Sequence, residues 1–311
     1  MPEPVVYLNE EFVPASEAKI PIYDHAVLIG ANLTDMTRTF GHRPFRLREH
    51  VERLYRSCKY ANIEPPISLD TMMDKTEQLI ETNLKLLTEE QDLDIVHFVT
   101  PGENPIYEPS GLEVRTTPTV CIHSFALPLH LWRHLFADGG HVVTPSIRHI
   151  PPQCIDPKTK YRSRLHMWFA DQQTQAVDPK AISLMLDLDG NLSECVGANF
   201  AIVCGNTILS PTSRNRLEGI SLITVRELAT ELGLGWVEKD LQPYDVINAD
   251  EALITTTPWC VAPCTKINNT PIGEGVPGPV FHKIINAWSD LVGIDVHRQI
   301  LDSNLKPVTT G

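Results

Sequence analysis

The sequence predicts an α+β fold in two domains. Its 311 residues suffice for two modest hydrophobic cores, and strand-like and helical segments alternate without an internal repeat. A break is expected at 124–130, where a strand-like segment runs into a proline that stops regular structure. We therefore expect a smaller N-terminal domain at 1–124, a linker at 125–131 and a larger C-terminal domain at 132–311.

The first domain is expected to combine short strands with two amphipathic helices. Apolar residues recur at helical spacing in the first helix, at Val51, Leu54 and Cys58. The expected strands lie at 5–9, 94–100 and 117–123, and the expected helices lie at 48–61 and 69–87.

The second domain is expected to hold helices around further strands and hairpins. Asp189-Gly190 and Gly205-Asn206 are turn sequences between strand-like runs, and Gly233 can end a helix. The expected helices lie at 163–176, 221–232 and 280–292, and the expected strands lie at 182–188, 200–203 and 207–210. Residues 304–311 lack apolar periodicity and are expected to form a loose tail.

Composition and charge exclude several classes of function. A net charge of −13 argues against a nucleic-acid surface, which would need a basic stripe. No apolar run approaches the ~18 residues that span a bilayer, and no secretory signal is visible. Seven scattered cysteines without a signal favour reduced thiols, so we expect a cytoplasmic protein with no membrane or nucleic-acid partner. Cys260 and Cys264 lack a second ligand pair at zinc spacing, so no metal is expected.

Lys160 and Glu194 are the residues with the clearest chemical potential. A lysine can carry a carbonyl cofactor as a Schiff base, and a carboxylate on a later strand or turn can pair with a pyridinium nitrogen. Those are the two protein groups that pyridoxal phosphate needs most. Lys158 competes with Lys160, but Asp156-Pro157 places Lys158 in a turn, so Lys160 is favoured.

The order of motifs around these residues resembles the class IV aminotransferases of pyridoxal-phosphate fold type IV. That family includes branched-chain and D-amino-acid aminotransferases, R-selective amine transaminases and aminodeoxychorismate lyase. The resemblance runs collinearly through Tyr7-Leu-Asn-Glu, Phe45-Arg-Leu-Arg-Glu-His-Val-Glu-Arg53-Leu, the Lys160 and Glu194 segments, Leu217-Glu-Gly-Ile-Ser221 and Ala249-Asp-Glu-Ala-Leu-Ile-Thr-Thr-Thr257. It implies a two-domain α+β fold of the D-amino-acid aminotransferase-like type, with pyridoxal 5'-phosphate as cofactor.

The resemblance also implies a role for each matching residue. Lys160 would form the Schiff base and act catalytically, while Glu194 would bond the pyridine nitrogen. The helix start after Gly219 would present backbone N–H groups to the phosphate. The other cofactor contacts implied by the matching motifs are Arg53, Leu217, Ile220, Ser221, Thr256 and Thr257.

Three positions depart from the usual family pattern. Leu165 stands where the branched-chain enzymes have a tyrosine that contacts the cofactor's phenolic oxygen, so the group making that contact is open. Pro101 stands where the family often has an arginine or aromatic residue that binds the substrate carboxylate. Thr34 stands where the family usually has an active-site tyrosine. Arg38 resembles an arginine near the substrate carboxylate in some relatives. A solvent-facing strand residue is the alternative for Arg38.

The resemblance implies a transaminase that moves an amino group between an amino acid and a 2-oxo acid. Branched-chain substrates are the default, followed by D-amino acids or R-amines, and the chirality of the substrate stays open. A lyase of the aminodeoxychorismate type would use the same lysine, carboxylate and phosphate contacts, and a non-catalytic binding module is a third alternative. In this fold type a partner subunit typically completes the active site, which implies a homodimer.

Overall fold

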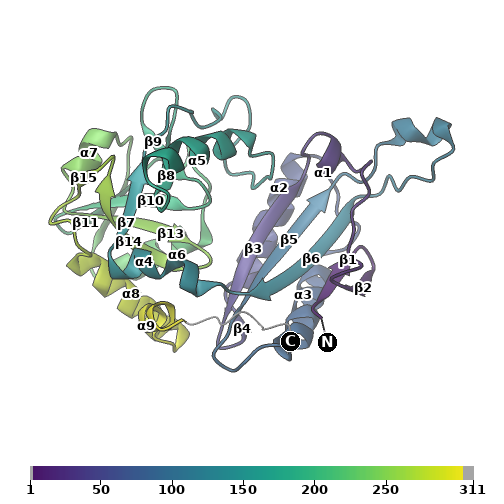
Figure 1. Ribbon diagram of the computed structural model, residues 1–311, viewed down its shortest axis with the longest axis horizontal. Coiled ribbons are helices and arrows are strands. Elements are labelled where there is room, and N and C mark those ends of the chain that lie inside the picture. The colour runs from purple at the N-terminus through teal and green to yellow at the C-terminus, as the bar shows by residue number, and fades with distance from the viewer. Residues whose placement is uncertain (1–2, 304–311) are drawn as a thin grey trace. The chain divides into compact units, whose positions relative to one another are not determined.

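The computed structural model of the protein describes residues 3–303, and contacts divide them into two compact units (Figure 1). Unit 1 runs from Glu3 to Leu127 and also includes Thr159–Arg164. Unit 2 consists of Pro128–Lys158 and the described residues from Leu165 onward. The chain therefore leaves unit 2 for one short segment that contains Lys160. The predicted domain ranges stay a prediction.

Unit 1 contains a six-stranded sheet and two long helices. Its elements are β1 (Val5–Leu8), β2 (Glu11–Pro14), α1 (His25–Leu28), β3 (Leu33–Phe40), β4 (Arg43–Pro44), α2 (Leu47–Tyr60), α3 (Leu69–Leu84), β5 (Leu93–Thr100), the 3-10 helix η1 (Pro105–Ser110) and β6 (Thr119–Ala126). The strand order is β2-β1-β6-β5-β3-β4, and neighbouring strands are antiparallel. The predicted helix at 69–87 begins as expected, at the Ser68 cap, but ends at Leu84.

The two faces of the unit 1 sheet have different surroundings. Leu33, Ile95 and Ile122 belong to one hydrophobic core with residues of α2 and α3. Because side chains alternate across a strand, their sequence neighbours lie on the opposite face. We call this opposite face the far face. Its residues are Thr34, Met36, Arg38 and Phe40 of β3, Asp94, Val96 and Phe98 of β5, and Cys121, His123 and Phe125 of β6.

The segment containing Lys160 pairs with β3 of unit 1. Tyr161 forms an antiparallel bridge with Leu33, and the Thr34 amide donates to the Lys160 carbonyl at 2.9 Å. Tyr161 packs against the same core as Leu33. Alternation therefore directs Lys160 and Arg162 to the far face.

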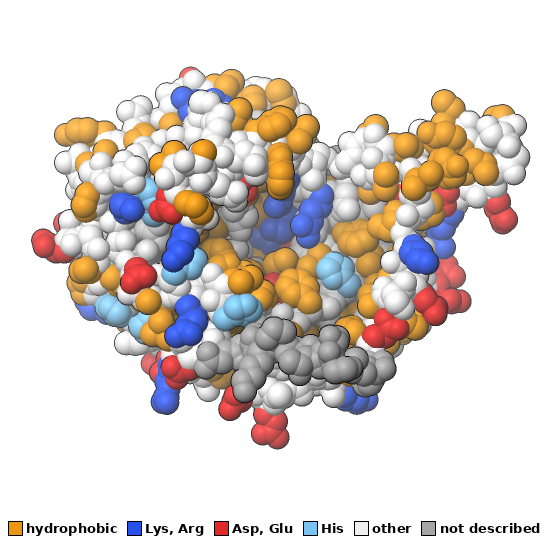
Figure 2. All heavy atoms as spheres, viewed as in Figure 1, with side chains coloured by type: hydrophobic (Ala, Val, Ile, Leu, Met, Phe, Trp, Pro, Cys, Tyr) orange, Lys and Arg blue, Asp and Glu red, His pale blue; other side chains and the backbone are white. Residues whose placement is uncertain are grey.

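A segment between β5 and β6 extends away from the unit 1 sheet (Figure 1). It includes η1, and hydrophobic side chains gather on it (Figure 2). Ile106 and Leu112 are exposed there, Ile106 by 70%. An exposed apolar patch of this kind often marks a contact surface.

Unit 2 contains a nine-stranded mixed sheet with helices packed on it. Its elements are the 3-10 helix η2 (Leu129–Trp132), α4 (Arg133–Ala137), β7 (Gly140–Val143), α5 (Leu165–Val177), β8 (Ile182–Leu186), β9 (Leu192–Cys195), β10 (Asn199–Cys204), β11 (Thr207–Ser210), α6 (Ile220–Glu231), β12 (Gly235–Glu238), α7 (Pro243–Ile247), β13 (Glu251–Thr256), β14 (Cys260–Ile267), β15 (Thr270–Pro271), α8 (Pro279–Val292) and α9 (Val296–Leu301). The strand order is β12-β11-β10-β13-β14-β7-β8-β9, with β15 paired to β14.

The expected hairpin around Gly205-Asn206 and the expected turn at Asp189-Gly190 are both present. β8 and β9 are antiparallel around Asp189-Gly190, and β10 and β11 are antiparallel around Gly205-Asn206. Gly233 has a φ of 69° just after α6, as expected of a helix-ending glycine. The predicted helix at 163–176 instead starts at Leu165, because Arg162 and its neighbours pair with unit 1.

Across residues 3–303, each helix is too short or too polar to cross a membrane. The predicted tail at 304–311 lies outside the described residues.

Candidate active site

Lys160 lies half-buried in a segment that is fixed to unit 1 by backbone contacts. Its amide donates to Ser57 Oγ at 3.2 Å, and Ser57 in turn donates to the Arg53 carbonyl at 3.0 Å. The alternative lysine, Lys158, is exposed, and its Nζ lies 3.5 Å from Asp156. This ion pair holds the Lys158 ammonium group at the surface, whereas Lys160 is partly buried.

Arg38 shares the far face with Lys160, and it is buried instead of facing solvent. Only 1% of it is exposed, so the alternative of a solvent-facing strand residue is wrong. Its Nε donates to the Thr39 carbonyl at 2.9 Å, and its Nη2 lies 3.5 Å from Asp92. The guanidinium carbon sits 3.9 Å from the centre of the Phe40 ring. These contacts offset the cost of burying the charge.

Arg53, expected to contact a phosphate, forms a buried network with two other groups of unit 1. Its Nε and Nη2 donate to the two oxygens of Asp35 at 2.8 and 2.9 Å. His50 Nδ1 lies 2.8 Å from the same carboxylate. Burial alone would raise the pKa of Asp35, but the Arg53 charge and the His50 hydrogen bond hold it far below its usual range. Burial also lowers the pKa of His50.

Glu194 is a buried carboxylate of unit 2, as are Asp187 and Glu251. It lies on β9, with 9% of its surface exposed, and its Oε2 accepts from the Leu217 amide at 2.9 Å and from Asn199 Nδ2 at 3.3 Å. His149 Nε2 lies 3.5 Å from Oε1. Two neutral donors therefore hold this acceptor group in a defined orientation, and the His149 ring lies beside it.

Asn199 connects this carboxylate to the start of α6. Its Nδ2 also donates to the Leu217 carbonyl at 2.9 Å, which fixes the backbone just before Gly219. A Cβ added at Gly219 would collide with Asn199 Oδ1. Position 219 therefore requires glycine because the Asn199 side chain passes so close to it.

The first turn of α6 is suited to hold an anion. Gly219 is the N-cap, and no described side chain caps the first turn, which begins with Ile220 and Ser221. Helix N-termini present unpaired N–H groups and the positive end of the helix dipole. Ser221 is also buried and adds a hydroxyl group.

Thr256 ends β13 beside the same elements. Its Oγ1 donates to the Gly197 carbonyl at 2.8 Å, and its neighbour Thr255 pairs with Asn199 across β10 and β13. Thr257 lies in the tight turn that leads into β14. The elements predicted to bind phosphate in unit 2 thus meet at one end of its sheet, next to Asn199.

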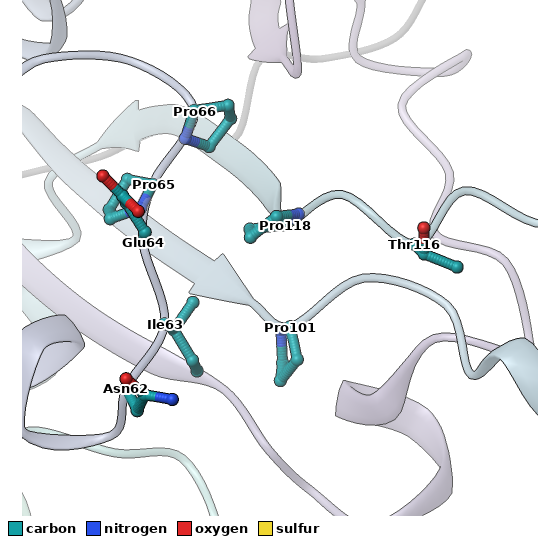
Figure 3. A pocket seen from close by; sticks show the side chains of 8 residues that line it. All are labelled: Asn62, Ile63, Glu64, Pro65, Pro66, Pro101, Thr116 and Pro118. Carbon is teal, nitrogen blue, oxygen red and sulfur yellow. The ribbon is translucent and has the colours of Figure 1, made fainter.

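The departures from the family pattern have defined positions. Thr34 lies on the far face and donates to the His97 carbonyl at 2.8 Å. Leu165 is 66% exposed at the start of α5. Pro101 lines a surface hollow of unit 1 (Figure 3), where Glu64 is the charged member of eight lining residues. This hollow supplies no cation to read a carboxylate.

Sequence reasoning missed four residues that shape these groups: His149, Asn199, Asp35 and Asp94. Asn199 closes the motif that contains Glu194, so its position in that motif was a usable signal. Asp35 follows Thr34 on a strand whose alternation turns it toward α2. His149 gave no signal, because it reaches Glu194 only through the fold.

Comparisons with known proteins identify relatives of the whole chain. The family model for amino-transferase class IV matches residues 32–267. A Methanocaldococcus jannaschii protein, provisionally assigned as a branched-chain-amino-acid aminotransferase, is 30% identical over 290 residues, covering 92% of this chain and 96% of that protein. The D-alanine aminotransferase of Bacillus licheniformis is 26% identical over 288 residues, covering 92% and 96%.

Two solved structures share the fold. The branched-chain amino acid aminotransferase of Escherichia coli matches with a TM-score of 0.85 at 24% identity, with 94% of this chain and 95% of that chain covered. A second branched-chain amino acid aminotransferase, complexed with N-(5'-phosphopyridoxyl)-L-glutamate, matches with a TM-score of 0.80 at 23% identity and the same coverage.

Proposed function

The chain belongs to the amino-transferase class IV family of pyridoxal-phosphate-dependent transaminases, and from this premise we propose how its residues divide the work. The proposed reaction moves an amino group from an amino acid to a 2-oxo acid, and bound pyridoxal phosphate would carry the group between them. Lys160 is the point of covalent attachment and the base that moves the substrate's α-proton. Branched-chain amino acids are the first donors to test, because the chain's motifs and one relative's name favour them.

The described residues fit the cofactor in chemical type. Bound pyridoxal phosphate would supply an electron sink for the substrate carbanion. Glu194 would hold the ring nitrogen, because it is a buried carboxylate whose orientation Asn199 and Leu217 fix. The uncapped first turn of α6 matches the phosphate in charge and in donor geometry.

Other residues would complete the phosphate contacts. Ile220, Ser221, Thr256 and Thr257 offer amides and hydroxyls next to the start of α6 or at the end of β13. Arg53 would add a positive charge from unit 1. Two donor nitrogens of Arg53 already bind the Asp35 carboxylate. Arg53 would therefore act on the phosphate mainly through its positive charge and not through a bidentate hydrogen bond.

Proton transfer depends on Lys160 Nζ. To act as a nucleophile and base, this amine must spend time deprotonated, and neighbouring cations favour that state. Arg38 and Arg162 share the far face with Lys160. This placement by strand register is the observation that carries the proposal.

The same cations are candidates for reading the substrate carboxylate. Arg38 is buried and already near Asp92, whereas Arg162 is exposed and directed to the same face. Thr34 lies between Arg38 and Asn32, the residue with which Arg162 pairs, and it would line the substrate position. We keep Arg38 as the first candidate and Arg162 as the second.

A panel of L- and D-amino acids, each with 2-oxoglutarate or pyruvate, tests the proposal. Transfer from an L-branched-chain donor supports it. Preference for D-alanine would favour the second candidate, which rests on the relative of that name. Pyruvate released from an amino substrate without any acceptor would instead indicate a lyase.

Assembly and location belong to the same proposal. The exposed apolar side chains of the segment around η1 support a homodimer, because a partner could cover them. All seven cysteines lie among the described residues, and none of them forms a disulfide there, which supports a reducing compartment such as the cytoplasm.

A further inference from the structure

The far face carries a carboxyl group to which the proposed reaction assigns no role. Asp94 of β5 pairs in register with Arg38 on one side and with Phe125 on the other, and 1% of it is exposed. Within residues 3–303, its Oδ1 has no hydrogen-bond partner. A buried acceptor without a donor is unfavourable, so a group that supplies one would bind there with a large gain.

Arg38, the nearest cation in register, attracts the Asp94 carboxylate, but Oδ1 still lacks a hydrogen-bond donor. Its Nε donates to the Thr39 carbonyl, and its Nη2 faces Asp92 at 3.5 Å. The charge of Arg38 is therefore shared with another carboxylate. Asp94 keeps acceptor capacity on the same face as Lys160.

Aromatic side chains adjoin Asp94 on this face. Phe98 and His123 have ring centroids 6.4 Å apart, and the His123 and Phe125 rings stack at 6.4 Å. Burial lowers the pKa of His123, so its ring is neutral near pH 7. These rings and the Asp94 carboxyl group together suit a substrate whose methylene chain ends in a cation, because the rings can contact the methylene groups and the carboxyl group can bind the cation.

We propose that Asp94 forms a subsite for a positively charged group on the amino substrate. The preferred donors would then be diamino acids or diamines, whose second ammonium group supplies several charge-assisted hydrogen bonds. A branched-chain side chain would instead leave Asp94 Oδ1 without a hydrogen-bond donor. This inference rests on the proposed transaminase function and narrows its amino donor.

Ornithine and norleucine provide a matched pair of donors, because an ammonium group in one replaces a methyl group in the other. We expect the wild-type protein to have a kcat/KM for ornithine at least about tenfold above that for norleucine, for the enantiomer it accepts. Asp94→Asn should abolish or reverse this ratio, because the amide lacks the charge. Asp74→Asn, at an exposed position of α3, removes the same charge elsewhere and should keep the ratio.

A binding measurement tests the subsite without turnover. Borohydride-reduced wild-type protein should bind 5-aminopentanoate more tightly than hexanoate in calorimetry, by a similar factor. Because this measurement uses only the wild-type protein, it tests the subsite even if Asp94→Asn fails to fold. Equal binding of the two acids would overturn the subsite.

Failure of the inference can be distinguished from failure of the proposed function. No borohydride label on Lys160 and no transfer from any donor would remove the proposed function itself. A labelled, active enzyme that prefers norleucine or leucine would leave that function standing and overturn the subsite. An unchanged ornithine-to-norleucine ratio in Asp94→Asn would reduce Asp94 to a structural counterion of Arg38.

Discussion

Most buried charged side chains of this protein have a partner that offsets the cost of their burial. Arg53 is matched by Asp35, and Arg216 of unit 2 donates to Glu218 and Glu238 at 2.5 and 2.6 Å. Removing one member of such a pair leaves a buried charge, at a cost of about 3–5 kcal/mol. Buried charges with incomplete pairing are therefore where function is expected.

The role of Lys160 is tested by chemical fixation. Borohydride should fix the cofactor onto the peptide containing Lys160, and Lys160→Ala should lower turnover by at least about a thousandfold, because attachment and proton transfer both use its amine. Mass spectrometry and steady-state rates measure the two effects. Lys158→Ala is the matched control, and a label on Lys158 would contradict the assignment.

Glu194 is predicted to act on rate more than on cofactor binding. Glu194→Gln should keep the hydrogen-bonding shape of the site but lose the charge that keeps the ring nitrogen protonated. We expect proton abstraction to slow by roughly a hundredfold or more, measured in single-turnover absorbance. Glu231→Gln, at an exposed position of α6, is the control. Unchanged turnover in Glu194→Gln would rule out the role.

Asp94 is predicted to make stability fall as pH rises. Burial raises its pKa from 3.8 to about 7, and the charges of Arg38, Lys160 and Arg162 offset this only in part. The folded state therefore holds its proton more tightly than the unfolded state, and this contribution is lost between about pH 4 and 7.

Denaturant unfolding of Asp94→Asn checks this sign. Relative to wild type, the variant should gain stability between about pH 5 and pH 8, by at most about 4 kcal/mol. Asp74→Asn should show no such trend. A gain that shrinks with rising pH would contradict the raised pKa.

Among the elements, the start of α6 depends on the close approach of Asn199 to Gly219. Gly219→Ala would drive a methyl group into Asn199 Oδ1, so that either the helix start or the amide must move. We expect the affinity for pyridoxal phosphate to fall at least about tenfold, with about 1–3 kcal/mol lost in stability.

Titration of the cofactor-free protein with pyridoxal phosphate measures this loss. Thr230→Ala, at the other end of α6, should leave the affinity unchanged. Asn199→Ser in the Gly219→Ala background should recover part of it, because the shorter side chain removes the collision. Asn199→Ser also removes the amide contacts to Glu194 and the Leu217 carbonyl, so the double variant is compared with Asn199→Ser alone. A large further loss relative to that single variant would contradict the collision.

Local signals explain which elements could be predicted from the sequence. The β10–β11 hairpin depends on Gly205-Asn206, and the end of α6 depends on Gly233, so short-range chemistry determines both. The predicted start of α5, at residue 163, was wrong by two residues. The helix begins at Leu165 because the Arg162 amide donates to the carbonyl of Asn32, which is far away in sequence. Such long-range backbone pairing leaves no trace in helical periodicity.

In the candidate site, too, some contacts follow from local sequence and others from long-range pairing. Glu194 and Asn199 lie within one short motif, so their proximity follows from the turn between them. The burial of Arg38 depends on Asp92, and the orientation of Glu194 depends in part on His149. Those pairs are brought together by sheet order, which a single sequence does not specify.

For the whole molecule, we predict a homodimer that depends on the segment around η1. Ile106 is 70% exposed, and burying it against a second subunit would contribute about 1.5–3 kcal/mol. Ile106→Glu should therefore shift sedimentation toward the monomer and reduce activity at low protein concentration. Tyr244→Glu, at an exposed position of α7, is the control, and a fully active wild-type monomer would contradict the prediction.

The alternation of side chains along β3 and β5 also separates two kinds of mutational tolerance. Codons that specify the far face, such as those for Thr34, Met36, Val96, Phe98 and Cys121, can vary without opening the core beneath α2 and α3. Their immediate neighbours in the gene cannot, because they build that core. A library that varies these far-face codons and keeps those for the buried Arg38 and Asp94 would therefore test new donors without altering the core against α2 and α3.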